Sequence, residues 1–249
     1  MSARIHAVLF DLDGTLRHNR PDGFETFVEY LEEVGCSFTP DQLRRAEQWT
    51  HSYWADSPDL RADIAETGAD TPAFWTRHSE RQLRALGLDG RAESLAPTVN
   101  RMFDERYEPA HHVPDDAAPT LAALRAAGYT LGLVSNRTEP LDELAAELGL
   151  RPYFDFTLAA GQARSWKPAP GIFLRAAELA GCAPAAAVYV GDNYFADVVG
   201  ARGAGLQPIL IDPKGIFPAP GCPVLRAVGE LPQALAGLGT IPRRAASTP

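Results

Sequence analysis

The sequence predicts an α/β protein built on a Rossmann-like parallel sheet with helices on both faces, interrupted by an inserted all-helical domain. Three observations predict this class. A mostly apolar strand at 5–10 ends at acidic residues, a long helical segment follows, and short apolar strands then alternate with helices from Pro114 onward. We therefore expect an α/β domain over 1–16 and 114–240, a helical domain over 17–113 and a flexible tail over 241–249.

The elements follow from the spacing of apolar residues. In the segment 17–113 apolar residues recur at helical spacing, as in Phe24, Phe27 and Leu31, and no strand is expected there. Helices between short buried strands, as found beyond Pro114, are typical of βαβ units. The elements expected there are helix 117–127, strand 129–134, helix 140–148, strand 154–158, helix 171–180, strand 187–190, helix 197–204 and strand 208–211.

The helical segment is rich in aromatic side chains, most of which we expect to form its own core. Tyr53 and Trp54 are the two that we expect to reach a substrate. Arg17 and His18, which follow the first strand closely, are either substrate contacts or part of a solvated hinge.

Composition limits the partners and the compartment. The 249 residues carry 23 Lys+Arg against 32 Asp+Glu, a net charge of −9, so neither nucleic acid nor an anionic membrane is favoured as a partner. The cysteines, Cys36, Cys182 and Cys222, are odd in number and lack metal-ligand spacing. The first apolar run is too short for a secretory signal or a membrane span. We predict a cytoplasmic protein and leave open whether it is a monomer or a homodimer.

Acidic residues follow two of the expected strands at the edge where open α/β sheets bind ligands. Asp11 and Asp13 come after the first strand, and Asp192 comes after the strand 187–190, with Asp197 five residues later. Carboxylates that lie close together are hard to keep ionised without a cation. Asp11 and Asp192 therefore predict an oxygen site suited to Mg²⁺.

The other candidates are groups that bind anions. Ser135 and Asn136 follow the strand 129–134. Lys167 is one of only two lysines, the other being Lys214, in a chain that otherwise uses arginine as its cation. A hydroxyl and an ammonium group next to a metal site are suited to binding the oxygens of a transferring phosphoryl group.

Taken in order, these segments resemble the four motifs of the haloacid dehalogenase superfamily, in its phosphatase form. The run from Asp11 to Thr15 resembles the DxDGT motif, 133–136 the second motif, Lys167-Pro168 the third, and the run from Gly191 to Asp197 the GDxxxxD form of the fourth. The helical segment resembles the C1-type cap of that superfamily.

The resemblance implies a role for each of these residues. Asp11 would be the nucleophile and a metal ligand, and Asp192 a second metal ligand. Asp13 would bind the metal through its backbone carbonyl, protonate the leaving group and then activate water. Ser135, Asn136 and Lys167 would bind the substrate phosphate, and Asp197 would support the metal ligands from outside.

The implied activity is Mg²⁺-dependent hydrolysis of a small phosphorylated metabolite through an aspartyl-phosphate on Asp11. A dehalogenase of this superfamily needs no acid for its halide and typically lacks the residue corresponding to Asp13, and a phosphonoacetaldehyde hydrolase needs a lysine that the insert does not contain. Two alternatives stay open, a phosphomutase on the same fold and a catalytically silent binding module. For Asp197, a plain helix-terminal carboxylate is nearly as good an interpretation.

Overall fold

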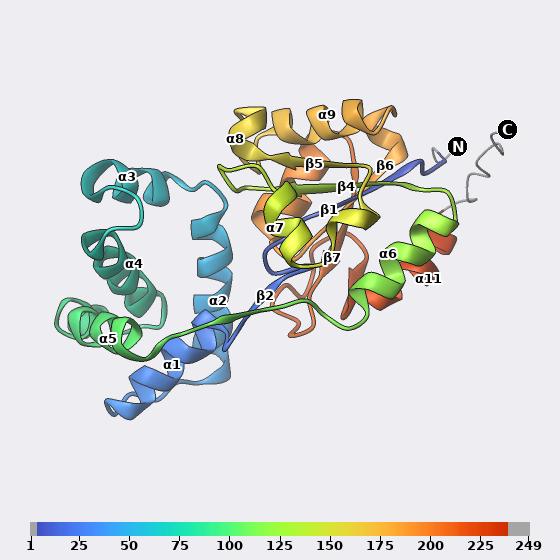
Figure 1. Ribbon diagram of the computed structural model, residues 1–249. Coiled ribbons are helices and arrows are strands. Elements are labelled where there is room, and N and C mark those ends of the chain that lie inside the picture. Colours follow the sequence, from blue (N-terminus) through green and yellow to red (C-terminus); the bar gives the residue numbers. More distant parts are fainter. Residues whose placement is uncertain (1–3, 239–249) are drawn as a thin grey trace, which may run out of the picture. The chain divides into compact units, whose positions relative to one another are not determined.

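The computed structural model describes residues 4–238, in which the chain forms two compact units (Figure 1). The described residues up to His18 and from Val113 onward make the first unit, and Asn19–His112 make the second. The tail expected over 241–249 lies outside the described residues. In the described part of the chain, no helix combines the length and the apolar character that crossing a membrane requires.

The first unit contains a six-stranded sheet in the order β5-β4-β1-β6-β7-β8, and every strand pair in it is parallel. The strands are β1 (Ala7–Phe10), β4 (Thr130–Ser135), β5 (Phe156–Ala159), β6 (Ala187–Gly191), β7 (Gln207–Ile211) and β8 (Val224–Leu225). The predicted α/β class with a parallel sheet is confirmed. The two-residue β8 was not predicted, because two residues show no period.

Helices cover both faces of this sheet, because successive side chains of a strand point to opposite sides. In β1, Val8 and Phe10 pack in one apolar cluster with α6 and α11, whereas Ala7 and Leu9 pack in another with α9. Figure 1 shows α6 and α9 on opposite sides of the strands. The helices of this unit are α6 (Ala117–Ala126), α7 (Asp142–Glu147), α8 (Ala160–Ala163), α9 (Pro170–Leu179), α10 (Gly200–Gly203) and α11 (Leu231–Leu238).

The helix expected over 197–204 begins earlier than predicted. A π-helical stretch, Tyr194–Val199, precedes α10. Its start is fixed by Asn193, whose side-chain oxygen accepts hydrogen bonds from the backbone N–H groups of Phe195 and Ala196, both at 3.0 Å. This cap was not predicted from the sequence, and it sets where the helical segment that carries Asp197 begins.

The second unit consists mainly of helices: α1 (Gly23–Glu33), α2 (Pro40–Trp54), α3 (Pro58–Thr67), α4 (Pro72–Ala85) and α5 (Ala92–Arg106). Three of them begin with the same device, a hydroxyl N-cap followed by proline at the first helical position. The caps are Thr39, Ser57 and Thr71. Phe27, Leu31 and Leu83 are buried in the apolar core of this unit.

The expectation that the segment 17–113 is purely helical is wrong at its ends. Two short strands, β2 (His18–Arg20) and β3 (Ala110–His112), pair to form a two-stranded sheet. Each has only three residues, most of them polar and at least partly exposed, so neither shows the apolar alternation by which a strand is recognised.

The aromatic residues of the second unit form a cluster around His78, whose ring centroid lies 5.0–5.8 Å from those of Trp49, Tyr53, Trp54 and Trp75. Tyr53 is only 1% exposed, and its hydroxyl donates to Asp63 at 3.0 Å. The prediction that Tyr53 reaches a substrate is therefore wrong, since its polar end is already occupied in the core. Trp54 is 38% exposed.

Candidate active site

The candidate residues of the first unit meet at the carboxyl edge of the sheet. β1 pairs with β4 on one side and with β6 on the other, with Phe10 opposite both Leu133 and Val190. This register brings the residues that follow the three strands to one place, as expected for parallel strands.

Lys167 is the most constrained of these residues. Its Nζ is buried and donates hydrogen bonds to Asp11 Oδ1 and to Asp197 Oδ1, both at 2.7 Å. It also lies 5.4 Å from the centre of the Tyr189 ring. Burial alone would lower the pKa of Lys167, but the charges of Asp11 and Asp197 raise it well above its usual value. The lysine is therefore a permanent cation held against the candidate nucleophile.

Three carboxylates, those of Asp11, Asp192 and Asp197, each offer an oxygen atom within 4.8 Å of the others. Burial raises the pKa of Asp192 to about 7, and the neighbouring charge of Asp197 adds to this. Burial likewise raises the pKa of Asp11, against the opposing effect of Lys167. Three carboxylates, two of them buried and that of Asp192 partly buried, face one ammonium group, so their negative charge exceeds the charge of the lysine. A further cation would offset the excess, and hard oxygen ligands suit Mg²⁺.

Two glycines allow these carboxylates to come so close. Gly14 has φ +89°, and a Cβ placed there would lie 2.3 Å from Asp192 Oδ2. A Cβ on Gly191 would lie 2.2 Å from Asp197 Oδ2. In addition, the Thr15 hydroxyl donates to Asp192 Oδ1 at 3.1 Å. The loop after β1 therefore packs with its backbone directly against the side chain that follows β6.

Asp197 is tied to both of its neighbours. One oxygen accepts from Lys167, and the other accepts from the backbone N–H of Asn193 at 2.9 Å. It lies in the first turn of the π-helical stretch and is 1% exposed. Its contacts join the helix to the lysine and thereby to Asp11.

The loop after β4 carries three consecutive residues of interest. Ser135 is buried at the last position of the strand. The Asn136 side chain, predicted to hold phosphate, instead binds the backbone of Lys167: its Oδ1 accepts from the Lys167 N–H at 2.6 Å, and its Nδ2 donates to the Lys167 carbonyl at 3.0 Å. Asn136 thus fixes the loop from which the lysine extends.

Arg137, the third of these residues, was not predicted from the sequence as part of the site. Its Nε donates to Asp13 Oδ2 at 2.7 Å and its Nη2 to Asp13 Oδ1 at 2.8 Å. Arg17 adds a hydrogen bond from Nη1 to Asp13 Oδ1 at 3.1 Å. Burial alone would raise the pKa of Asp13, but the hydrogen bonds and charge of Arg137 lower it below its usual value, with help from the charge of Arg17. Its position directly after Ser135-Asn136 was the only sequence signal for Arg137.

A family model described as haloacid dehalogenase-like hydrolase matches residues 5–205. The chain belongs to this family. The resemblance drawn from the motifs is confirmed, and the protein is a hydrolase of the haloacid dehalogenase type.

Relatives extend over nearly the same length. Haloacid dehalogenase-like hydrolase domain-containing protein 3 of Xenopus laevis is 41% identical over 218 residues, which cover 86% of each chain. Glyceraldehyde 3-phosphate phosphatase of Methanopyrus kandleri is 30% identical over 215 residues, covering 83% of this chain and 84% of that protein. Among solved structures, a 2-haloacid dehalogenase from Pseudomonas syringae has a TM-score of 0.55 and 27% identity, covering 94% of this chain and 100% of that one.

Proposed function

We propose that this hydrolase is a Mg²⁺-dependent phosphatase that cleaves small organic phosphate monoesters through an aspartyl-phosphate on Asp11. The observation that carries the proposal is the position of Asp11. One of its oxygens accepts from Lys167 at 2.7 Å, and it contributes to a group of carboxylate oxygens within 4.8 Å of one another. A carboxylate can attack an anionic phosphoryl group only when cations offset the charge of both the carboxylate and the phosphoryl oxygens.

The metal would be held by the carboxylates of Asp11 and Asp192 and by the backbone carbonyl of Asp13. When bound, Mg²⁺ would supply the positive charge that offsets these carboxylates and the phosphate oxygens. Lys167 and the Ser135 hydroxyl would bind the remaining phosphate oxygens. Asn136 and Asp197 hold the backbone and the ammonium group of Lys167, respectively.

In the first step a carboxylate oxygen of Asp11 attacks phosphorus, and the ester P–O bond breaks. The electron pair of that bond goes to the departing oxygen, which takes a proton from Asp13. In the second step water attacks the phosphorus of the aspartyl-phosphate and gives one proton to Asp13. The bond between phosphorus and the Asp11 oxygen breaks, its electron pair stays on the Asp11 carboxylate, and inorganic phosphate leaves. Because Arg137 and Arg17 favour the carboxylate form of Asp13, its first proton must enter with the substrate or the solvent.

Two observations favour hydrolysis of a phosphate ester over removal of a halide. A halide departs without protonation, whereas a phosphate ester needs an acid for its leaving oxygen. Asp13, in the same loop as Asp11 and fixed by two arginines, is placed to serve as that acid. The named phosphatase among the relatives supports the same substrate class. A cytoplasmic location stays a prediction.

The experiment is phosphate release from a panel of phosphate esters by the wild-type protein, with Mg²⁺ and with a chelator. We expect Asp11→Asn to abolish release, and Asp115→Asn, a change at an exposed aspartate of the same unit, to leave it intact. The proposal fails if Asp11→Asn retains full activity or if no ester in the panel is cleaved. Conversion of a sugar phosphate into its isomer in the presence of a bisphosphate would indicate a phosphomutase instead.

A further inference from the structure

The carboxylate of Asp13 is held in an unusually complete way for a side chain that is not deeply buried. The two hydrogen bonds from Arg137 go to different oxygens, at 2.7 and 2.8 Å. Such a bidentate contact fixes the plane of the carboxylate as well as its position. The bond from Arg17 is single and longer, at 3.1 Å, and comes from four residues along the same loop. The orientation of Asp13 is therefore set chiefly by Arg137.

The backbone that carries Arg137 is itself fixed. The carbonyl of Arg137 accepts from the N–H of Gly161 in α8 at 3.2 Å. A Cβ on Gly161 would lie 2.0 Å from the carbonyl oxygen of Thr138. The loop after β4 thus rests directly on the backbone of α8, and this contact fixes the point from which Arg137 reaches across to the loop after β1.

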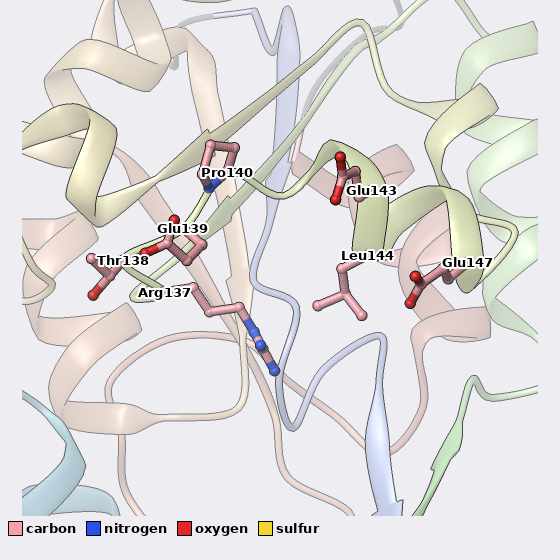
Figure 2. Close-up of a pocket in the computed structure, with 7 residues that line it drawn as sticks. All are labelled: Arg137, Thr138, Glu139, Pro140, Glu143, Leu144 and Glu147. Carbon is pink, nitrogen blue, oxygen red and sulfur yellow. The ribbon is translucent and has the colours of Figure 1, made fainter. Parts of the chain in front are cut away.

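The other side of Arg137 is open. Its side chain is 40% exposed, and it lines a cavity of about 370 Å³ (Figure 2). The residues that line this cavity are Arg137, Thr138, Glu139, Pro140, Glu143, Leu144 and Glu147. Figure 2 shows the guanidinium group extending away from Pro140. A long arginine side chain next to open space keeps one orientation only if its far end is tied, and here the tie is Asp13.

We infer that Arg137 is a positioning residue, which orients the Asp13 carboxylate toward the oxygen of the leaving group. The contact between Gly161 and Thr138 holds the backbone of Arg137 at the distance from Asp13 that this role needs. The inference rests on the proposed function, because it assigns Arg137 a part in the proton transfer by Asp13. Arg137 itself does not touch the reacting atoms.

The test uses two esters that differ in their need for an acid. p-Nitrophenyl phosphate releases a stable phenolate without protonation, whereas an alkyl phosphate must have its leaving oxygen protonated. As the alkyl ester, the test uses whichever alkyl phosphate of the panel the wild-type protein cleaves fastest. Comparing kcat/KM restricts the measurement to steps up to the transfer of phosphorus to Asp11. Glycerol phosphate is the first ester to try.

For Arg137→Gln we expect kcat/KM to fall about 100-fold with the alkyl ester but no more than about 5-fold with p-nitrophenyl phosphate, since a positioned acid contributes roughly 10²–10⁴-fold. For Arg137→Lys the loss of kcat/KM with the alkyl ester should be intermediate, because lysine keeps the positive charge but cannot make the two-nitrogen contact of a guanidinium group. Arg151→Gln, which breaks an arginine–aspartate pair of the same unit at 2.6 Å, should leave both rates unchanged.

Two further variants separate positioning from a general structural effect. In an Asp13→Asn background, Arg137→Gln should add little, because its effect passes through Asp13. Gly161→Ala should reproduce the selective loss without altering Arg137, whereas Gly203→Ala, where a Cβ meets nothing within 4 Å, should not.

Equal losses with both esters, or a full additional loss in the Asp13→Asn background, would overturn the inference. Should Arg137→Gln fail to fold, Arg137→Lys and Gly161→Ala give the same comparison. Failure of the proposed function is recognised separately, by a wild-type protein that cleaves no ester or by an active Asp11→Asn variant.

Discussion

Lys167 is buried between Asp11 and Asp197, and the free energy that this contact contributes depends on whether all three charged groups are present. Removing two carboxylates and an ammonium group from water costs free energy, which their attraction offsets only when all partners are present. Here the lysine makes hydrogen bonds at 2.7 Å to both acids. Loss of the lysine would leave two buried carboxylates to repel each other, so we expect both stability and activity to depend on this side chain.

We predict that Lys167→Ala lowers kcat at least 100-fold and lowers the free energy of unfolding by about 3 kcal/mol, the scale for breaking one side of a buried ion pair. The chain offers a matched control in its other lysine, Lys214, which is exposed. Lys214→Ala should change neither quantity. Phosphate release and urea unfolding measure the two effects, and a fully active Lys167→Ala would contradict the role given to the lysine.

His78 is a buried polar group in the aromatic cluster of the second unit. Its Nε2 is buried and has no hydrogen-bond partner in the part of the chain that the structure describes. Burial lowers the pKa of His78 to about 4, against the weaker opposite effect of Asp63. Asp63 is itself bound by Arg81 and by the Tyr53 hydroxyl, so little of its charge remains to stabilise an imidazolium.

Because the folded pKa of His78 lies below its ordinary value of 6.5, the unfolded chain binds a proton between these pH values that the folded chain does not. The stability that the neutral ring contributes is present above pH 6.5 and is lost as the pH falls toward 4. From pH 7 to pH 5 the loss amounts to about 2 kcal/mol. Urea unfolding followed by tryptophan fluorescence at the two pH values measures it, since Trp49, Trp54 and Trp75 surround His78.

His78→Phe serves as the reference for that measurement. It fills the same aromatic cluster without a titrating group, so the difference in unfolding free energy between pH 7 and pH 5 should shrink by the same amount. An unchanged pH dependence in His78→Phe would assign the effect to other groups, the carboxylates first.

At the scale of elements, the loops after the strands are shaped by where glycine permits a close approach. Gly14 combines a left-handed backbone, φ +89°, with a missing Cβ that would collide with Asp192. Gly35 has a nearly equal φ of +82° but nothing within 4 Å of its missing Cβ. The pair separates the cost of the backbone conformation from the cost of the collision.

We predict that Gly35→Ala costs about 1 kcal/mol of stability, from the backbone alone, and leaves activity unchanged. Gly14→Ala should lower stability by more than this. It should also lower kcat by at least 10-fold, because Asp192 must move away from the loop that carries Asp11. Thermal unfolding and phosphate release measure both. Equal effects of the two variants would mean that the approach of Gly14 to Asp192 has no functional role.

The elements also show what a sequence can and cannot predict. β1, β4 and β6 were predictable because each is a short apolar run that ends at a polar residue, and their parallel pairing brings Asp11 next to Asp192. β2 and β3 were not, because each has only three residues, most of them polar, and shows no apolar alternation.

Side-chain contacts were harder to predict than strand ends. The interaction between Arg137 and Asp13 joins residues 124 positions apart, and nothing local in the sequence marks an arginine that makes it. The spacing of the aromatic residues could not show that Tyr53 lies in the core of the second unit, with its hydroxyl bound to Asp63.

At the scale of the whole molecule, the first strand is held by parts of the chain far from it. β1 lies between β4 and β6, although Ala7 is more than a hundred residues from Thr130 and Ala187. The family match from 5 to 205 spans both compact units, so the long segment between β1 and β4 belongs to the family pattern. Since Asp11 and Asp192 come together only when this sheet has formed, a metal bound between them would stabilise the folded state.

The last prediction follows from this coupling between metal binding and folding. Mg²⁺ at about 100 times its dissociation constant should raise the free energy of unfolding by about 2.7 kcal/mol and the thermal midpoint by about 5–10 °C. The chain as a whole is acidic, with a net charge of −9, so part of any stabilisation could come from ions held loosely at the surface. Asp192→Asn removes one of the three clustered carboxylates and should abolish the response to Mg²⁺, whereas Asp115→Asn lowers the surface charge equally and should retain it. If both variants respond to Mg²⁺ as the wild-type protein does, the ion binds elsewhere and the carboxylates of Asp11 and Asp192 do not hold it.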